Sequence, residues 1–173
     1  MPRVAFCTLG FMRAAAGQPL VQGFMDRLDS VGMAVEAADG FLWWDGYVGR
    51  EGWAGRHAMP EAFPDGEHSD AAATLSLWSD LASVRAFAYH DPHAEALRGR
   101  ADWFLKTDWP TYVAWWVDDD QVPSWADAME RLAHLHDHGS TPHAFTFTLA
   151  FDPAGQPYSL RVAGSASRAE DPA

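Results

Sequence analysis

The sequence predicts one α+β domain with a ferredoxin-like order of elements: strand, helix, strand, strand, helix and strand, then an appended helix and strand. Two observations support this fold class. Short apolar stretches with the two-residue period of strands alternate in that order with longer stretches of helical period. The chain has 173 residues, of which 48% are hydrophobic, and this suits one domain with a sizeable core.

The first half of the chain provides the first two strands and the first helix. Residues 4–11 are apolar at successive positions, which predicts a strand covered on both faces. Residues 20–35 carry apolar side chains at helical spacing, and Asp39-Gly40 ends that helix. Residues 41–44 then begin a second strand.

Residues 45–70 break the pattern, because they are rich in Gly, Pro and charged residues. A loop longer than about 15 residues in a compact domain is usually functional or disordered. The aromatic residues inside this one favour a folded lid that contributes to specificity. His57 and His68 lie within it, and a variable surface loop without a function is the alternative.

The stretch that follows the loop organises the rest of the chain. Residues 74–78 read as a buried strand that ends in Ser79-Asp80, a typical helix cap. A short helix follows from Leu81. Asp91 and Pro92 suit the cap and first position of a second helix, which extends to Phe104.

A histidine and an arginine share an apolar stripe on that second helix. His93, Leu97, Arg100 and Phe104 are spaced so that they fall on one face, and the apolar pair predicts that this face points inward. Burying His93 or Arg100 is costly unless the side chain is paired, hydrated or used. The structural alternative is a His93 bound to a backbone carbonyl and an Arg100 whose stem reaches the surface.

The remainder predicts a central strand, a third helix and a last strand. Residues 111–117 are apolar on both faces, and residues 125–136 carry a helical stripe that ends at Gly139. Residues 143–151 form the last strand and complete a single domain over residues 1–151. Residues 152–173 are predicted to be a tail, in which residues 158–162 add an edge strand.

Charge and cysteine content exclude several classes of function. The net charge of −12 argues against binding to nucleic acid or to an anionic membrane surface. No run approaches the roughly 18 apolar residues that span a bilayer, and the first residues resemble a strand rather than a signal peptide. The single cysteine, Cys7, fits a reducing cytoplasm and a buried strand position rather than a nucleophile.

Three histidines near the end of the third helix resemble a cluster of metal ligands, but their spacing does not suit one. His134 and His138 share a face of a helix, whereas His136 points to the opposite side. In the last helical turn the imidazoles interact favourably with the helix dipole. The sequence therefore predicts no metal ligand here.

Three separated blocks carry a resemblance to a known family: SLWSDLASVRAFAYHDPHAEALRGRADWF, YVAWWV and AMERLAHLHDHGSTPHAFTF. Over roughly residues 1–151 the chain resembles a bacterial domain-of-unknown-function family of the dimeric α+β barrel superfamily, which is ferredoxin-like. That superfamily also contains antibiotic-biosynthesis-type monooxygenases, haem-degrading monooxygenases, chlorite dismutases and aldoxime dehydratases. The resemblance implies a homodimer, whose two sheets we expect to meet through apolar faces such as those of Tyr112 and Trp115.

The superfamily also implies an enzyme that acts on a small hydrophobic molecule. We expect a monooxygenase-type oxidoreductase for an aromatic or polyketide-like metabolite, with His93, Tyr89 and Arg100 as the catalytic residues. Four tryptophans are expected to line its cavity: Trp78, Trp103, Trp115 and Trp116. The alternatives are a cofactor-free cyclase, isomerase or dehydratase that uses His93 as acid or base, and a non-catalytic ligand-binding dimer.

The cofactor question centres on His93 alone. An interior histidine can serve as a general base or as an axial haem ligand, and superfamily relatives use both. No CxxCH motif occurs, so any haem would be bound noncovalently. The sequence therefore establishes no cofactor, and it leaves haem on His93 open.

Overall fold

The computed structural model describes residues 1–48, 70–89 and 93–159, and its centre is a four-stranded antiparallel sheet. The strands are β1 (Arg3–Phe11), β2 (Phe41–Val48), β3 (Ala71–Trp78) and β4 (Tyr112–Val117). Their order in the sheet is β2-β3-β1-β4. With helices between β1 and β2 and between β3 and β4, this is the ferredoxin-like arrangement, and the predicted fold class is confirmed.

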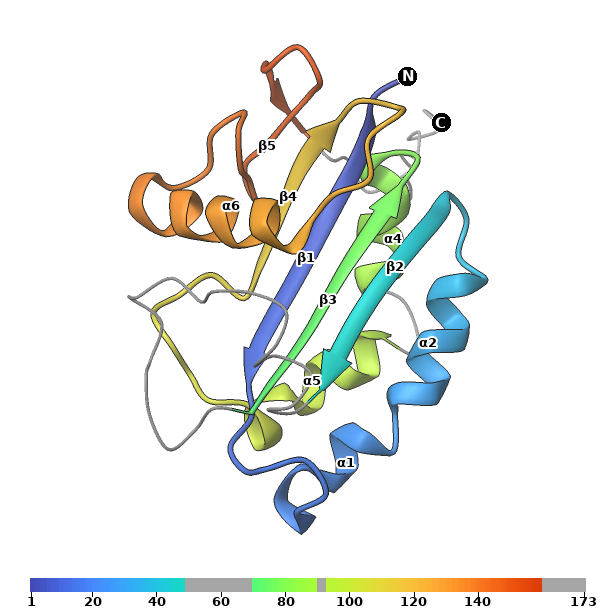
Figure 1. Ribbon diagram of the computed structural model, residues 1–173, viewed down its shortest axis with the longest axis vertical. Coiled ribbons are helices and arrows are strands. Elements are labelled where there is room, and N and C mark those ends of the chain that lie inside the picture. The colour runs from blue at the N-terminus through green and yellow to red at the C-terminus, as the bar shows by residue number, and fades with distance from the viewer. Residues whose placement is uncertain (49–69, 90–92, 160–173) are drawn as a thin grey trace, which may run out of the picture.

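Within the described residues, six helical segments surround the sheet (Figure 1). Between β1 and β2 lie η1 (Pro19–Val21), α1 (Gln22–Met25) and α2 (Leu28–Glu36), where the sequence predicted one continuous helix. Between β3 and β4 lie α4 (Leu81–Tyr89) and α5 (His93–Trp103), and α6 (Trp125–His138) follows β4. The second strand is longer than predicted, because β2 continues four residues beyond Trp44 into the segment expected to be a loop.

One face of the sheet packs against α2 and α4. Val4, Phe6 and Trp78 point to this face, where Trp78 is fully buried. From the helices, Val35, Leu81 and Val84 complete the same core cluster. The face thus carries a closed apolar core under the first half of α4.

The opposite face is covered by α6 of the same chain, which crosses in front of β1 and β4 in Figure 1. The cluster beneath it contains Ala5, Cys7, Leu9, Leu75, Val113 and Trp115 from the strands and Trp125, Ala128, Met129, Leu132 and Leu135 from α6. Cys7 is fully buried as predicted, and burial raises the pKa of its thiol.

The dimer contact expected from the sequence is wrong in its residues. Tyr112 packs on the α4 side of the sheet and Trp115 on the α6 side, so the two side chains cannot belong to one face. Trp115 is 1% exposed, and Arg131 of α6 lies over its ring at 5.2 Å. A helix of the chain itself covers the face that the prediction assigned to a partner.

Local signals explain the ends of α6. The Ser124 side chain accepts a hydrogen bond from Asp127 N, and the Asp127 side chain accepts one from Ser124 N, which forms a capping box. Gly139 follows the last turn with φ 70°, a conformation that suits glycine, and the helix ends there as predicted.

The stripe that α5 buries differs from the predicted one. Arg100 is exposed, and the buried residue of α5 is Trp103, which joins a small cluster with Met12 and Val21. Added Cβ atoms on Gly99 and Gly23 would lie 2.6 and 3.1 Å from the Trp103 ring. The indole therefore fits between α5 and α1 only because both helices carry glycine there.

The predicted last strand, residues 143–151, is mostly irregular. Phe145 forms an isolated bridge to Ala114, and only β5 (Ala150–Phe151) is regular, paired with β6 (Pro157–Tyr158). Side chains replace the missing strand partners, since Thr146 N donates to Ser140 Oγ and Phe147 N donates to Tyr112 Oη. The alternating pattern was therefore a misleading strand signal.

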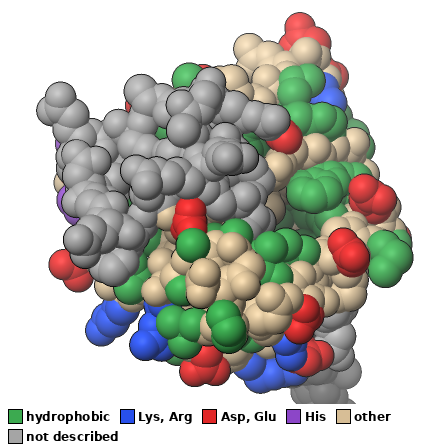
Figure 2. Space-filling view, turned by 60° about the horizontal axis from the view of Figure 1, so that its bottom comes forward, with side chains coloured by type: hydrophobic (Ala, Val, Ile, Leu, Met, Phe, Trp, Pro, Cys, Tyr) green, Lys and Arg blue, Asp and Glu red, His purple; other side chains and the backbone are tan. Residues whose placement is uncertain are grey.

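The end of the molecule that carries α1 and α5 has a mixed surface (Figure 2). Acidic and basic side chains both lie along its lower edge, and hydrophobic side chains lie between them. Among the described helices, none has the length and apolar character to cross a membrane.

Candidate functional site

His93, the first residue of α5, lies against the C-terminal end of α4. Its Nδ1 atom is 2.9 Å from the carbonyl oxygen of Ala88. Its ring packs against Phe87, with centroids 5.0 Å apart and planes at 44°. The side chain is half-buried. The carbonyl contact of the structural alternative is therefore present, and it engages one ring nitrogen only.

That contact determines the tautomer of His93. A carbonyl oxygen can only accept, so Nδ1 carries the proton and Nε2 holds the lone pair. Burial lowers the pKa of His93, although the hydrogen bond to Ala88 opposes the shift. No described residue makes a hydrogen bond with Nε2. At neutral pH His93 therefore has the form that a general base requires.

Neither of the two other predicted catalytic residues has a hydrogen bond or ring contact with His93 among the described residues. Tyr89, the last residue of α4, is 54% exposed, and Arg85 lies 5.6 Å from its ring centroid. Arg100 is exposed on α5, in agreement with the structural alternative in which it reaches the surface rather than with an inward-pointing side chain. Ala96 and Trp103 pack in the cluster beside α1, and of the predicted stripe Phe104 joins them there, whereas Arg100 does not.

The four tryptophans expected in one cavity occupy three separate core clusters. Trp78 and Trp116 belong to the cluster under α2 and α4, Trp115 lies under α6, and Trp103 packs against η1 and α1. The indole nitrogen of Trp78 donates to Ser76 Oγ at 2.9 Å, and that of Trp116 donates to the Phe151 carbonyl at 2.7 Å. They are structural side chains, and the shared aromatic cavity is a wrong prediction.

A row of hydroxyl groups on the α4 side of the sheet was not predicted. Thr74, Thr8 and Tyr112 stand directly opposite one another across β3, β1 and β4. The Oγ1 atoms of Thr8 and Thr74 are 2.8 Å apart, and all three side chains are partly exposed. We call these three residues the hydroxyl row. It offers donors and acceptors to a ligand at the level where α4 ends.

Aromatic rings border the hydroxyl row. Phe147 stacks on Phe6 at 5.3 Å, lies 5.2 Å from Tyr112 and approaches Tyr89 at 6.0 Å. Burial raises the pKa of Tyr112, so its hydroxyl stays protonated at neutral pH. We call Phe6, Tyr89, Tyr112 and Phe147 the aromatic group. Tyr89 was a predicted site residue, whereas the other three were not predicted to belong to the site. The alternation in β1 and β4 put Phe6 and Tyr112 on one face of the sheet, but it did not show that Phe147 would join them.

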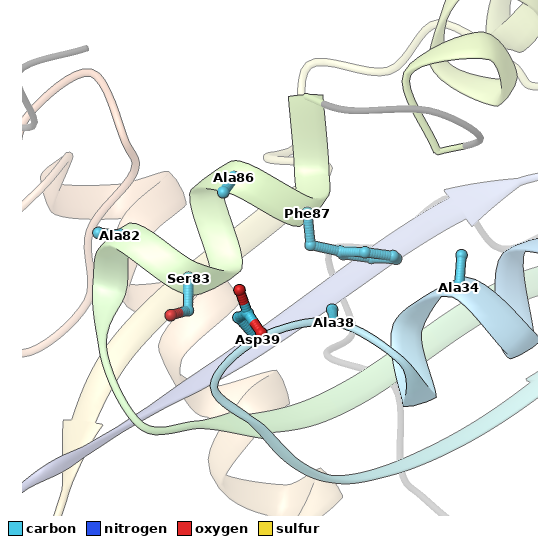
Figure 3. A pocket seen from close by; sticks show the side chains of 7 residues that line it. All are labelled: Ala34, Ala38, Asp39, Ala82, Ser83, Ala86 and Phe87. Atoms are coloured by element: carbon cyan, nitrogen blue, oxygen red, sulfur yellow. The ribbon is translucent and has the colours of Figure 1, made fainter. Parts of the chain in front are cut away.

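A groove runs between α2 and α4 on the outer side of the helix layer. Its volume is about 470 Å³, and it is lined by Ala34, Ala38, Asp39, Ala82, Ser83, Ala86 and Phe87. Figure 3 shows Phe87 reaching from α4 toward Ala34 of α2, with Asp39 and Ser83 at the other end. Small side chains create the space: Ala82 and Ala86 of α4 face Ala34 of α2 and Ala38 just after that helix. The sequence contained this signal, but it was not used.

The helix histidines are arranged partly as predicted. His136 stacks on Trp109, with centroids 4.0 Å apart, whereas His134 and His138 lie together at 4.7 Å. Two residues that the sequence did not bring into this group, Glu130 and His143, stand beside His134. The proposed lid can be described only at its start and at Asp70, since residues 49–69, including His57 and His68, lie outside the described residues.

Comparison with known proteins identifies a family and no function. A family model described as a domain of unknown function, DUF3291, matches residues 3–161. Among curated proteins no sequence matches the chain.

Solved structures with similar folds are distant in sequence. A protein of unknown function, NE2512 from Nitrosomonas europaea, is 13% identical and covers 72% of this chain and 97% of its own, with a TM-score of 0.45. SnoaB, a cofactor-independent oxygenase from Streptomyces nogalater, is 13% identical over 70% and 97%, with a TM-score of 0.40. A dimeric ferredoxin-like protein of unknown function from Jannaschia sp. CCS1 is 13% identical over 68% and 99%, with a TM-score of 0.39. At this similarity no function is transferred.

Proposed function

This chain belongs to the DUF3291 family of domains of unknown function, and from that premise we propose that it is a small-molecule enzyme. Its reaction is of monooxygenase type, and its substrate is a hydrophobic metabolite of aromatic or polyketide-like character. The observation that carries the proposal is His93, a half-buried imidazole whose Nδ1 is held by a carbonyl and whose Nε2 keeps its lone pair.

This reaction requires a general base and a binding site that is shielded from water. Nε2 of His93 removes a proton from an acidic carbon of the substrate, and the resulting anion transfers electrons to O₂. For a methylene group between activating carbonyls or rings, the balanced reaction is CH₂ + O₂ → C=O + H₂O. One oxygen atom of O₂ enters the product, and the other leaves as water. The substrate itself is the reductant.

The binding site we propose lies at the C-terminal end of α4. His93 contacts Ala88, and the next residue along the chain is Tyr89 of the aromatic group. Rings of a planar substrate would stack on Phe147 and Tyr89, while the hydroxyl row binds its carbonyl oxygens. The raised pKa of Tyr112 supports a role as hydrogen-bond donor there.

Haem on His93 has no support from the described residues around it. Phe87 packs on the imidazole with ring centroids 5.0 Å apart, and the Nε2 atom that would bind iron is the proposed base. The groove between α2 and α4 does not include His93 among its lining residues. We therefore propose a reaction without haem.

Oxygen uptake tests the proposal. The purified chain is incubated with a panel of anthrones, quinols and β-dicarbonyl aromatics in an oxygen electrode, and the products are examined by mass spectrometry. His93→Gln should reduce kcat by about 100-fold or more, because it removes the base. His136→Gln, an exchange at a histidine on the other side of the sheet, is the matched control. Equal turnover by His93→Gln and the wild type would contradict the role of His93.

The closest alternative is a cofactor-free cyclase, isomerase or dehydratase that uses the same base. The same tautomer of His93 favours it, since proton transfer is common to all these reactions. An anaerobic assay separates the two. Product formed in the absence of O₂, with no oxygen uptake in its presence, would replace the monooxygenase proposal by this one.

The groove between α2 and α4 supports a third proposal, a non-catalytic ligand-binding protein. No histidine is among the residues that line this groove, so a ligand bound there would not meet the proposed base. On this proposal a hydrophobic fluorescent probe binds there, and Ala86→Trp displaces it by filling the groove. His93→Gln would leave the binding of the probe unchanged. Loss of binding in His93→Gln but not in Ala86→Trp would reject it.

We further propose that the chain is a homodimer in the cytoplasm. Exposed apolar side chains on the edge strand β2 and on α2 support a contact there, namely Leu42, Trp44 and Met33. One buried cysteine supports a reducing compartment. Light scattering measures the mass in solution, and Leu42→Glu should halve it. A monomeric wild-type chain at micromolar concentration would contradict the dimer.

A further inference from the structure

The outer side of α6 and the turn after it bring together three side chains that can bind a metal ion. One ligand atom from each of Glu130, His134 and His143 lies within 4.8 Å of the others. We propose that these residues, the α6 triad, bind one divalent transition-metal ion, with Zn²⁺ as the expected ion. The triad is on the opposite side of the sheet from His93, so this inference is independent of the proposed function.

The fold of the turn assembles the triad. Glu130 and His134 are one helical turn apart and therefore share a face of α6. Gly139 ends the helix, and a bridge between Thr141 and Ala144 folds the next residues back along it. The turn places Nε2 of His143 3.0 Å from both carboxylate oxygens of Glu130.

Thr141 holds two parts of this arrangement in position. Its Oγ1 atom lies 2.9 Å from Nε2 of His134 and also accepts a hydrogen bond from the backbone N of His143 at 3.3 Å. One hydroxyl group thus orients a ligand ring and the turn that carries the other histidine. Hydrogen bonds of this kind commonly orient the ligands of metal sites.

The donor set selects the class of ion. Two imidazoles and one carboxylate suit Zn²⁺ and neighbouring first-row ions, whereas Mg²⁺ and Ca²⁺ prefer oxygen ligands alone. Zn–N bonds measure about 2.0–2.1 Å, so the three ligand atoms must come closer than in the ion-free chain. Glu130 and His143 are exposed, which allows their side chains to rotate inward. Three protein ligands leave one tetrahedral position for water.

The side chain of Arg131 opposes binding of a metal ion to His143. Its Nη1 lies 3.1 Å from Nδ1 of His143 and also donates to the His143 carbonyl. A guanidinium only donates, so in the ion-free chain Nδ1 accepts and Nε2 of His143 carries the proton. Binding of the ion at Nε2 moves that proton to Nδ1, which then donates and forces Arg131 away from the ring. Arg131→Gln should therefore tighten metal binding about tenfold.

Cobalt and zinc titrations of the tag-free chain test the site. Co²⁺ is followed by its visible absorption, which becomes intense in a tetrahedral site, and Zn²⁺ is followed by calorimetry. Glu130→Gln and His143→Gln should each weaken binding at least tenfold, and Thr141→Val about tenfold. His136→Gln, on the side of α6 that faces Trp109, is the matched control and should bind as the wild type does.

Three outcomes would overturn the inference. The first is the absence of a tetrahedral Co²⁺ spectrum at saturating ion. The second is an equal loss of binding in His136→Gln and His143→Gln, which would mean scattered surface binding. The third is a loss of binding in His138→Gln with none in His143→Gln, which would assign the ion to the His134–His138 pair of the helix alone. Circular dichroism of each variant confirms that the fold is kept.

Discussion

His93 and the α6 triad stand on opposite sides of the same sheet and hold their imidazole rings differently. The His93 ring is fixed by a backbone carbonyl five residues earlier in the chain, and it packs on a phenylalanine of the preceding helix. The triad joins a helix to a turn and links Glu130 to a histidine 13 residues later through side chains near the surface. The contacts of His93 come from residues close to it in the chain, whereas the triad forms only because the turn after α6 returns along that helix.

The difference between these regions shows what decides the chemistry of a histidine. A carbonyl partner and burial keep His93 neutral with a defined tautomer, which favours proton transfer. A carboxylate and a second imidazole at exposed positions can converge on a cation instead. Each of the following predictions strengthens or weakens one side of this comparison, from the largest expected effect to the smallest.

The largest effect is expected where α6 is anchored to the sheet. Leu132 is fully buried beneath α6, and Leu132→Ala leaves a cavity there. We expect the free energy of unfolding to fall by about 2–5 kcal/mol, measured by urea denaturation. Leu97→Ala on the half-buried face of α5 is the control and should cost less. An equally small effect at both positions would mean that α6 contributes little to the core.

A smaller effect is expected at Ser76, the buried hydroxyl beneath α4. It donates to the Phe6 carbonyl and accepts from the indole nitrogen of Trp78 at 2.9 Å. Ser76→Ala leaves that indole N–H buried without an acceptor, so the free energy of unfolding should fall by about 1–3 kcal/mol. Ser30→Ala, at an exposed hydroxyl, should change it by less than about 0.5 kcal/mol in the same urea measurement.

The capping box of α6 ranks next. Ser124→Ala removes the acceptor for Asp127 N and should lower the free energy of unfolding by about 0.5–2 kcal/mol. Zinc affinity of the α6 triad should stay the same, because the cap lies at the other end of the helix. A large loss of zinc binding in this variant would mean that the triad depends on the whole helix rather than on its last turns and the turn beyond.

The smallest effect concerns pH on the His93 side. The pKa of His93 is lowered from 6.5 by burial, so the unfolded chain binds the proton more readily than the folded chain does. The free energy of unfolding should be at its full value above about pH 6.5 and should fall as the pH drops toward the folded pKa. Urea denaturation between about pH 8 and about pH 5 measures this loss. His93→Gln should remove that component, and an unchanged pH profile would contradict the cause.

The order of elements could be predicted from the sequence alone. Strand and helix periods are local, and so are the stop at Gly139 and the restart of the helix at residue 93. The sequence also pointed to the end of α4, where His93 and Tyr89 lie, since both residues are within a few positions of the helix break. These features depend on neighbours in the chain, which a single sequence contains.

Only the tertiary structure decided which surfaces meet. A sequence pattern can show that a side chain faces inward, but it does not show which side chains it will contact. Four buried or half-buried tryptophans were therefore assigned to one cavity, although they lie in three separate clusters. Likewise, apolar strand faces do not reveal whether a partner or α6 covers them. The triad required Glu130 and His143 to meet through a turn held by Thr141 and Arg131. Such contacts arise from the path of the chain in space, because periodicity records the direction of a side chain but not its partner.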